Sequence, residues 1–197
     1  MRKAKIVLVG SAHTGKTSLV NRFVYGEFSP HTMPSTQPAF FQKKINYCGT
    51  EFTLEIWDTA GQDQYHALSP MYYRDADAGI VVFDLTDMSS FAKSKQWVSE
   101  LRQNRGDAIT IVLAGNKSDL QSIRTVKLDS IQQFAKQINA ESFETSAKTG
   151  ENVGLLFNAL VKTLSSRTQT PQTQNMVGRK RSSVRFEDRL EEQKSCC

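Results

Sequence analysis

The sequence predicts an α/β fold, in which helices cover both faces of a six-stranded, mostly parallel sheet. Short Val/Ile-rich runs of strand length alternate along the chain with segments whose apolar residues follow the helical period of 3.6. One connection is too short for a parallel pair, because Cys48-Gly49-Thr50 fits a hairpin turn between the second and third runs. The expected sheet therefore contains one antiparallel strand.

Each expected element follows from its local pattern. Runs rich in β-branched residues predict strands over Ala4–Val9, Phe40–Tyr47, Glu51–Trp57, Gly79–Leu85, Thr110–Ala114 and Ser142–Glu144. Apolar residues at helical spacing predict helices over residues 89–103, 131–138 and 153–164, and residues 10–17 are expected to open a further helix.

The chain divides into one domain, residues 1–165, and a tail, residues 166–197. After Leu164 the composition changes to Ser, Thr, Gln, Asn and charged residues, which cannot form a packed core. We expect this tail to be disordered and to span roughly 30 Å as a flexible coil.

Composition excludes several classes of protein. The longest apolar runs are much shorter than the ~20 residues of a membrane-spanning helix, and the first five residues show no secretory signal. Cys48 is the only cysteine before the final pair, so no disulfide framework is expected and the protein should be cytosolic. Of the net charge of +5, the residues from Ser165 onward carry +3, which leaves +2 for the body. A body so nearly neutral argues against nucleic-acid binding.

The run Gly10–Thr17 follows the first strand and opens a helix, the context in which a phosphate-binding loop is credible. Glycines let the backbone N–H groups turn toward phosphate oxygens, and a helix N-terminus adds partial positive charge. Lys16 is expected to reach the β- and γ-phosphates, and the Thr17 hydroxyl to bind Mg²⁺. The residues expected to contact the nucleotide here are Ala12, His13, Thr14, Gly15, Lys16, Thr17 and Ser18.

Two further segments are expected to meet the γ-phosphate. Asp58 ends the third strand and is expected to reach the Mg²⁺ shell, the Gly61 N–H to meet the γ-phosphate, and Gln62 to orient the attacking water as the catalytic residue. Thr36 lies in a Pro-rich loop and is expected to add its hydroxyl to Mg²⁺ and its N–H to the γ-phosphate. Loss of that phosphate would remove both contacts and relax the loop.

The base is expected to be guanine. Asn116-Lys117-Ser118-Asp119 follows a buried strand, and the Asp119 carboxylate matches the N1–H and N2 amine that guanine carries and adenine lacks. Ser146-Ala147-Lys148 follows the sixth strand and is expected to complete the pocket, with the Ala147 N–H directed at guanine O6. Phe28 is either a core aromatic or an edge-on contact to the base.

These motifs occur in one order, and the sequence closely resembles the Ras superfamily and, within it, the Rab family over roughly residues 4–165. The resemblance rests on Gly10–Thr17, Thr36, Trp57–Gln62, Tyr72-Tyr73-Arg74, Asn116–Asp119, Glu144–Lys148 and Cys196-Cys197. The run from Tyr65 to Arg74 is most similar to the endosomal Rabs.

The resemblance implies a P-loop small GTPase fold and a Mg²⁺-dependent switch that cycles between GTP and GDP to regulate vesicle and endosomal traffic. It implies an exchange factor, a GTPase-activating protein, effectors, a GDP-dissociation inhibitor and a prenylation escort as partners of a monomer. It also assigns Phe41, Trp57 and Tyr72 to the effector surface, although three core aromatics would give the same pattern. Cys196 and Cys197 resemble the Rab signal for double geranylgeranylation, which would anchor the chain to the cytosolic face of endomembranes, with endosomes favoured.

Some positions depart from the Rab pattern. Gln37-Pro38 removes a backbone donor from the loop after Thr36, and Asp63-Gln64 replaces the usual Glu-Arg. Ala12 is larger than glycine at a position close to the catalytic glutamine, so intrinsic hydrolysis is expected to be slow. A GTP-binding scaffold with very low hydrolysis is therefore an alternative, and an ATP-dependent P-loop kinase is a third possibility that Asp119 argues against.

Overall fold

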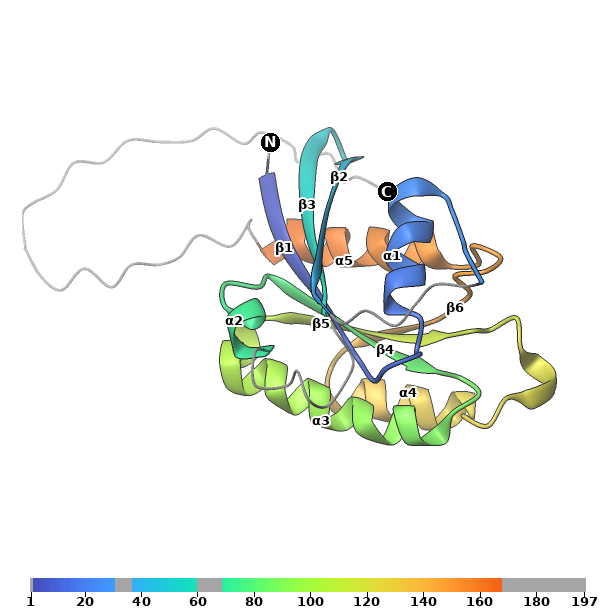
Figure 1. Ribbon diagram of the computed structural model, residues 1–197. Helices are drawn as coiled ribbons and strands as arrows, with labels where there is room; N and C mark the ends of the chain where they lie inside the picture. Colours follow the sequence, from blue (N-terminus) through green and yellow to red (C-terminus); the bar gives the residue numbers. More distant parts are fainter. Residues whose placement is uncertain (1, 31–36, 60–68, 168–197) are drawn as a thin grey trace, which may run out of the picture.

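A six-stranded sheet runs through the computed structural model, which describes residues 2–30, 37–59 and 69–167 (Figure 1). The strands are β1 (Arg2–Val9), β2 (Ala39–Tyr47), β3 (Thr50–Asp58), β4 (Ala78–Asp84), β5 (Thr110–Asn116) and β6 (Glu141–Thr145). Their order across the sheet is β2-β3-β1-β4-β5-β6. The pair of β2 and β3 is antiparallel and every other pair is parallel, which confirms the expected sheet.

Five α-helices accompany the sheet in the described part of the chain: α1 (Lys16–Tyr25), α2 (Ser69–Tyr73), α3 (Met88–Arg105), α4 (Leu128–Gln137) and α5 (Val153–Arg167). Short 3-10 turns occupy Gly106–Ala108 and Gln121–Ile123. Local sequence explains several helix ends. Gly26 ends α1 with a φ of 76°, which glycine adopts without strain, and the Asp87 side chain caps α3 by accepting a hydrogen bond from the Ser89 N–H at 2.8 Å.

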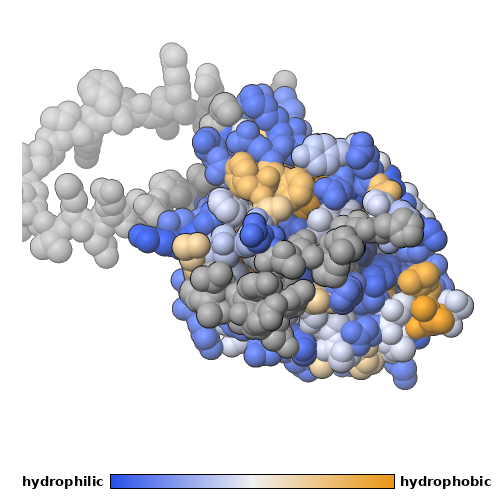
Figure 2. Space-filling view, viewed as in Figure 1, coloured by the Kyte–Doolittle hydropathy of each residue, from blue (hydrophilic) through white to orange (hydrophobic). Residues whose placement is uncertain are grey.

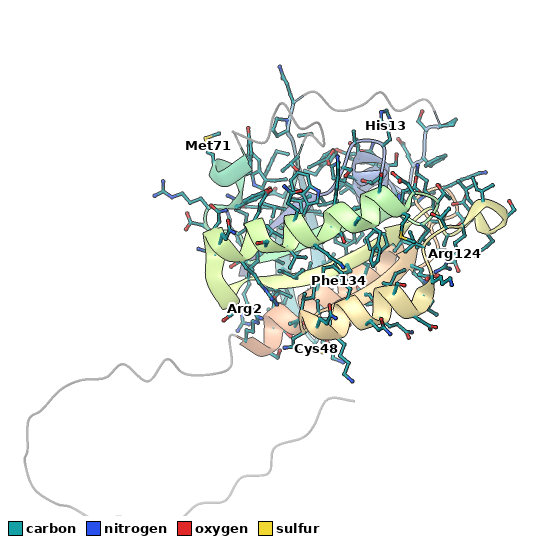
Figure 3. The ribbon with its side chains drawn as sticks, turned by 90° about the horizontal axis from the view of Figure 1, so that it is seen from below. Arg2, His13, Cys48, Met71, Arg124 and Phe134 are labelled. Atoms are coloured by element: carbon teal, nitrogen blue, oxygen red, sulfur yellow. The ribbon has the colours of Figure 1, made fainter. Side chains whose placement is uncertain are left out.

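Two apolar cores lie on opposite faces of the sheet. Alternation along β1 directs Ile6 and Leu8 to one face and Val7 and Val9 to the other, and all four are buried. Helices α1 and α5 cover the first face, and α3 and α4 cover the second (Figure 1). Figure 3 shows the second layer from below, with Phe134 of α4 lying between that helix and α3. Strands covered on both sides explain why β4, β5 and the second half of β1 are almost continuously apolar.

The carboxyl ends of the parallel strands share one edge of the sheet. The terminal residues there are Val9, Asp58, Asp84, Asn116 and Thr145. Strand β1 lies between β3 and β4, and the order of the strands along the sheet reverses at β1. Sheets of this class bind ligands at such a point. The fold therefore brings the polar motifs of the sequence to one place.

The boundaries differ from the expected ones by up to three residues. The turn between β2 and β3 contains only Cys48 and Gly49, since Thr50 already pairs with Tyr47. Both turn residues have positive φ, 47° and 73°, and this geometry matches the twist of the flanking strands. Helix α5 continues to Arg167, two residues beyond the expected end of the domain.

Among the described helices, none combines the length and the hydropathy needed to cross a membrane.

Candidate nucleotide-binding site

The loop between β1 and α1 has a backbone that two glycines make possible. Gly10 has a φ of 144°, and a Cβ there would lie 2.0 Å from the Val82 carbonyl oxygen. Gly15 has a φ of 88°, and a Cβ there would lie 2.4 Å from Asn116 Nδ2. Helix α1 starts at the next residue with no acidic side chain in its first turn, so the positive end of its dipole is left for an anion.

Lys16 is buried within this loop. Its ammonium donates hydrogen bonds of 2.9 Å to the carbonyl oxygens of Gly10 and Ser11. Burial lowers the pKa of the Lys16 ammonium to about 8, and the nearby Asp58 carboxylate opposes that shift. The cation therefore lies among neutral carbonyls and would gain stability from the negative charge of a phosphate.

Thr17 and Asp58 meet beside the loop. The Thr17 hydroxyl donates to Asp58 Oδ2 at 2.6 Å, while Asp58 Oδ1 is buried and has no hydrogen-bond partner among the described residues. Burial raises the pKa of the Asp58 carboxyl, and the hydrogen bond from Thr17 and the charge of Lys16 lower it. Hydroxyl and carboxylate oxygens are the ligands that Mg²⁺ prefers. An unsatisfied buried carboxylate oxygen next to a hydroxyl therefore fits such a cation.

Asn116 connects three loops at the carboxyl edge of the sheet. Its Nδ2 donates to the Thr14 carbonyl oxygen at 2.9 Å, and its Oδ1 accepts from the Ala147 N–H at 3.1 Å. The Thr145 hydroxyl also donates to Oδ1, at 3.4 Å. One buried amide therefore fixes the phosphate loop against both segments expected to hold the base.

The acidic group expected to read the base is held by its neighbours. Asp119 Oδ1 accepts a hydrogen bond of 2.7 Å from the Ser146 hydroxyl, and Lys148 Nζ lies 3.9 Å from Asp119 Oδ2. Lys117 Nζ forms a 2.6 Å ion pair with Asp84 at the end of β4. These contacts bring both expected base-binding segments, residues 116–119 and 146–148, within one site.

The sequence did not identify Arg22, which binds the backbone of the segment expected to contact the base. Its Nε donates to the Ala147 carbonyl oxygen at 2.8 Å and its Nη2 to the Lys148 carbonyl oxygen at 2.7 Å. No motif identifies an arginine in the second half of a helix. The sequence also assigned no role to Ser118. Its hydroxyl donates to Glu151 Oε2 at 2.7 Å and connects residues 116–119 to the loop that precedes α5.

The remaining described positions of the site are distributed as follows. His13 is exposed at the outer edge of the loop with a φ of 64°, and Figure 3 shows its side chain at the surface. Ala12, within the phosphate loop, and Ser18, in the first turn of α1, are half-buried. Phe28 is partly buried and packs against the core that α1 and α5 cover.

Comparison with known proteins identifies this arrangement. A model of the Ras family matches residues 5–166. The chain belongs to the Ras family. It is 43% identical over 160 residues to "Ras-related protein Rab-21" of Geodia cydonium, which covers 81% of this chain and 70% of the relative. It is 40% identical over 168 residues to the proteins of that name from Bos taurus and Homo sapiens, covering 85% of this chain and 76% and 75% of those relatives.

Within the Ras family, the chain is a Rab-type small GTPase. It binds guanine nucleotide, hydrolyses GTP and regulates membrane traffic. The expected fold, enzyme class and family are therefore confirmed.

The aromatic residues expected on the Rab effector surface lie on two faces of the sheet. Trp57 packs against Tyr72, with ring centroids 5.8 Å apart, and against Phe40 at 5.1 Å. Phe41 points to the opposite face, where its ring lies 6.2 Å from that of Tyr25. Figure 2 shows a hydrophobic area over β2 and β3. The structure thus adds Phe40, which sequence reasoning did not select, to the Trp57 and Tyr72 cluster.

Five expected site residues lie outside the described residues: Thr36, Gly61, Gln62, Cys196 and Cys197.

Proposed function

We propose that the carboxyl edge of this sheet binds GTP or GDP together with Mg²⁺, and that the loops containing Thr36 and Gly61 change conformation when the γ-phosphate is lost. The roles given to individual residues are part of this proposal. Ala12, His13, Thr14, Gly15, Lys16 and Ser18 would contact phosphate, and Asn116, Lys117, Asp119, Ser146, Ala147 and Lys148 would surround guanine, with Phe28 beside it.

The hydrogen bonds of Asn116 are the observation that carries the proposal. Because one side chain bonds both Thr14 and Ala147, the phosphate loop and the base segments keep a fixed separation. That separation suits a ligand with an anionic end and a purine end. Asp119 offers two carboxylate oxygens to the base, which matches the paired N–H donors of guanine.

The phosphate end supports an anionic, metal-bound ligand. Lys16 would exchange its carbonyl partners for phosphate oxygens, which stabilise its charged form. Thr17 and Asp58 would hold Mg²⁺, joined by Thr36 in the GTP form. When bound, Mg²⁺ would neutralise charge on the β- and γ-phosphates. Gln62 would orient the water that attacks the γ-phosphate.

Base selection gives the sharpest test. We expect Asp119→Asn to lose preference for guanosine nucleotides and to bind xanthosine nucleotides, because the new amide can donate to the second carbonyl of xanthine. Lys16→Ala should abolish tight binding of both guanosine and xanthosine nucleotides. Competition between GTP, ATP and XTP for nucleotide-free chain measures both changes. Retained guanosine preference in Asp119→Asn would place the base elsewhere.

Hydrolysis is tested separately in a single turnover of bound GTP. We expect Gln62→Leu to lower the rate while leaving GTP affinity unchanged, since Gln62 would act on water and not on binding. An equal rate in the parent chain and in Gln62→Leu would favour the alternative of a GTP-binding scaffold. No contact among the described residues supports that alternative.

The membrane and the partners form the last part of the proposal. Geranylgeranyl groups on Cys196 and Cys197 would hold the chain on endosomal membranes, since two lipids give a stable anchor and one does not. An exchange factor, a GTPase-activating protein, effectors, a GDP-dissociation inhibitor and a prenylation escort would act on the monomer, with Phe40, Trp57 and Tyr72 facing effectors. Imaging tagged chain with Cys196→Ser and Cys197→Ser tests the anchor, and an unchanged endosomal pattern would contradict it.

A further inference from the structure

A groove of about 500 Å³ lies at the edge of the domain opposite to the nucleotide site. It is bounded by the starts of β5 and β6 and by the carboxyl-terminal ends of α3, α4 and α5, the helices seen in Figure 3. Its volume falls in the range of roughly 300–1,000 Å³ that binding pockets occupy. Ile109, Ile111 and Ile138 form part of its lining, each with 5–8% of its surface exposed, between polar and charged side chains. The groove could therefore accept one or two apolar side chains.

The charged residues that line the groove carry a net charge of +1. Arg102, Lys136 and Arg167 contribute three positive charges, against two negative charges from Asp107 and Glu141. Arg102 donates to the Ile138 carbonyl oxygen, and Arg167 donates to the Ala108 carbonyl oxygen. These bonds hold two guanidinium groups at the rim beside the apolar floor. A fitting segment would therefore be apolar and acidic.

The chain itself supplies such a segment. Helix α5 ends at Arg167, which lines the groove, so the 30 residues from 168 to 197 begin at its rim. Within them, Phe186 and Leu190 stand four residues apart, a spacing that places two side chains on one side of a helical turn. The same stretch, residues 186–192, contains four carboxylates and one arginine, a net charge of −3.

The connection is long enough to turn back. The 18 residues from 168 to 185 would span about 23 Å root-mean-square as a flexible coil, which is comparable to the size of the domain. A short flexible connection gives an effective concentration on the order of 1 mM. A segment with an intrinsic Kd of about 0.1 mM would then be docked in roughly nine chains out of ten.

We propose that residues 186–192 dock in this groove of the same chain, with Phe186 and Leu190 against the isoleucines and the carboxylates near Arg102, Lys136 and Arg167. Docking gives the acidic stretch a cationic partner, whereas an anionic membrane would repel it. The five residues 193–197 would then span at most about 17 Å, so the terminal cysteines would stay close to this edge of the domain. This inference is independent of the nucleotide site.

Paramagnetic relaxation in the full chain tests the contact. A nitroxide is attached to Cys196 in a chain with Cys48→Ser and Cys197→Ser, and isoleucine methyl signals are recorded in the GDP form. If about nine chains in ten are docked, the signals of Ile109, Ile111 and Ile138 should fall to about a tenth of their diamagnetic intensity. The signal of Ile123, which lies beyond the opposite edge of the sheet, should keep most of its intensity.

Variants decide between docking and random collision. Phe186→Ala with Leu190→Ala should restore the groove signals, and both residues follow the end of α5 by 19 or more positions, so we expect the domain to stay as stable as in the parent chain. Lys136→Glu should weaken docking about tenfold, whereas the matched reversal Lys127→Glu, at the other end of the same helix, should not. Broadening that persists without Phe186 and Leu190, or that Lys127→Glu removes equally, would overturn the proposal. Broadening between a nitroxide-labelled chain and a separate isotope-labelled chain would instead assign the groove to a second copy and equally overturn it.

Discussion

Arg22 donates a 2.8 Å hydrogen bond from its Nε to the carbonyl oxygen of Ala147, joining the first helix to the loop expected to contact guanine O6. Its two other nitrogens donate to the carbonyl oxygens of Lys148 and Gly26. One guanidinium group therefore ties together the end of α1 and the last segment of the base site. All three contacts are made to backbone carbonyl oxygens, so this arginine holds the backbone around the base site in place.

Loss of Arg22 should speed the release of GDP. Hydrogen bonds from a charged donor are worth about 1.5–3 kcal/mol each, so Arg22→Ala should raise the dissociation rate of GDP roughly 10- to 100-fold. Stopped-flow release of a fluorescent GDP analogue measures the rate. Arg22→Lys keeps the charge and loses the forked geometry, and it should give an intermediate rate. A rate equal to that of the parent chain in both variants would show that the loop is held by other contacts.

Asp58 should make GDP release depend on Mg²⁺. Chelation of Mg²⁺ with EDTA should accelerate release from the parent chain by about tenfold or more, the factor that 1.4 kcal/mol of metal-dependent binding produces. In Asp58→Asn that acceleration should largely vanish, because the buried carboxylate oxygen that fits the cation is gone. Asp84→Asn removes another buried carboxylate, from the end of β4, and should keep the EDTA effect. Equal acceleration in Asp58→Asn and the parent would mean that the metal lies elsewhere.

The sequence alone predicts the sheet and the elements that place the site. Period-two and continuous apolar runs identify all six strands, because covered strands leave little freedom of composition. Helix α2 was not foreseen, since Ser69–Tyr73 is too short to show a helical period. The contacts of Arg22 were missed for a different reason: they join residues 125 or more positions apart, and no local pattern encodes them.

The aromatic residues of β2 show a second limit of prediction from sequence. A motif assigns a role to a position, whereas the strand register decides the face on which each side chain lies. Phe40 is paired with Trp57 across the two strands, so the two rings share a face. Phe41 is paired with Ile56 and faces the other core. The register follows from the two-residue turn at Cys48 and Gly49, which could not be fixed from sequence.

The Lys16 ammonium should make nucleotide affinity depend on pH. Its pKa is lowered to about 8 in the chain without ligand, and bound phosphate should raise it again. Above about pH 8 the empty site has lost a proton that the complex holds, so binding takes up that proton and affinity falls by up to about tenfold per pH unit. Below pH 8 both states are protonated and Lys16 contributes no slope.

Calorimetry in buffers of different ionisation enthalpy counts this proton between about pH 7 and 9. Lys16→Arg provides the control, because arginine stays charged throughout, whereas titration of the guanine base affects both chains equally. A proton uptake that Lys16→Arg leaves intact would assign the titration to another group.

Phe40 lies on the same face of the sheet as Trp57, and we expect it to contribute to effector binding there. The Phe40 ring is 51% exposed and lies tilted against Trp57, with ring centroids 5.1 Å apart. Phe40→Ala should therefore expose more of the indole and shift its fluorescence to longer wavelength, while buried Trp97 stays unchanged. Exposed aromatic anchors of an interface commonly contribute 2 kcal/mol or more, so affinity for an effector captured with the GTP-loaded chain should fall about 30-fold or more. Tyr25→Ala removes a ring of similar exposure, 62%, from the opposite face and should leave that affinity within about twofold.

Because the loss of either exposed ring should cost only about 1 kcal/mol of folding free energy, unfolding midpoints distinguish a binding defect from a stability defect. If Phe40→Ala binds the effector as tightly as Tyr25→Ala does, the effector recognises a different face of the sheet.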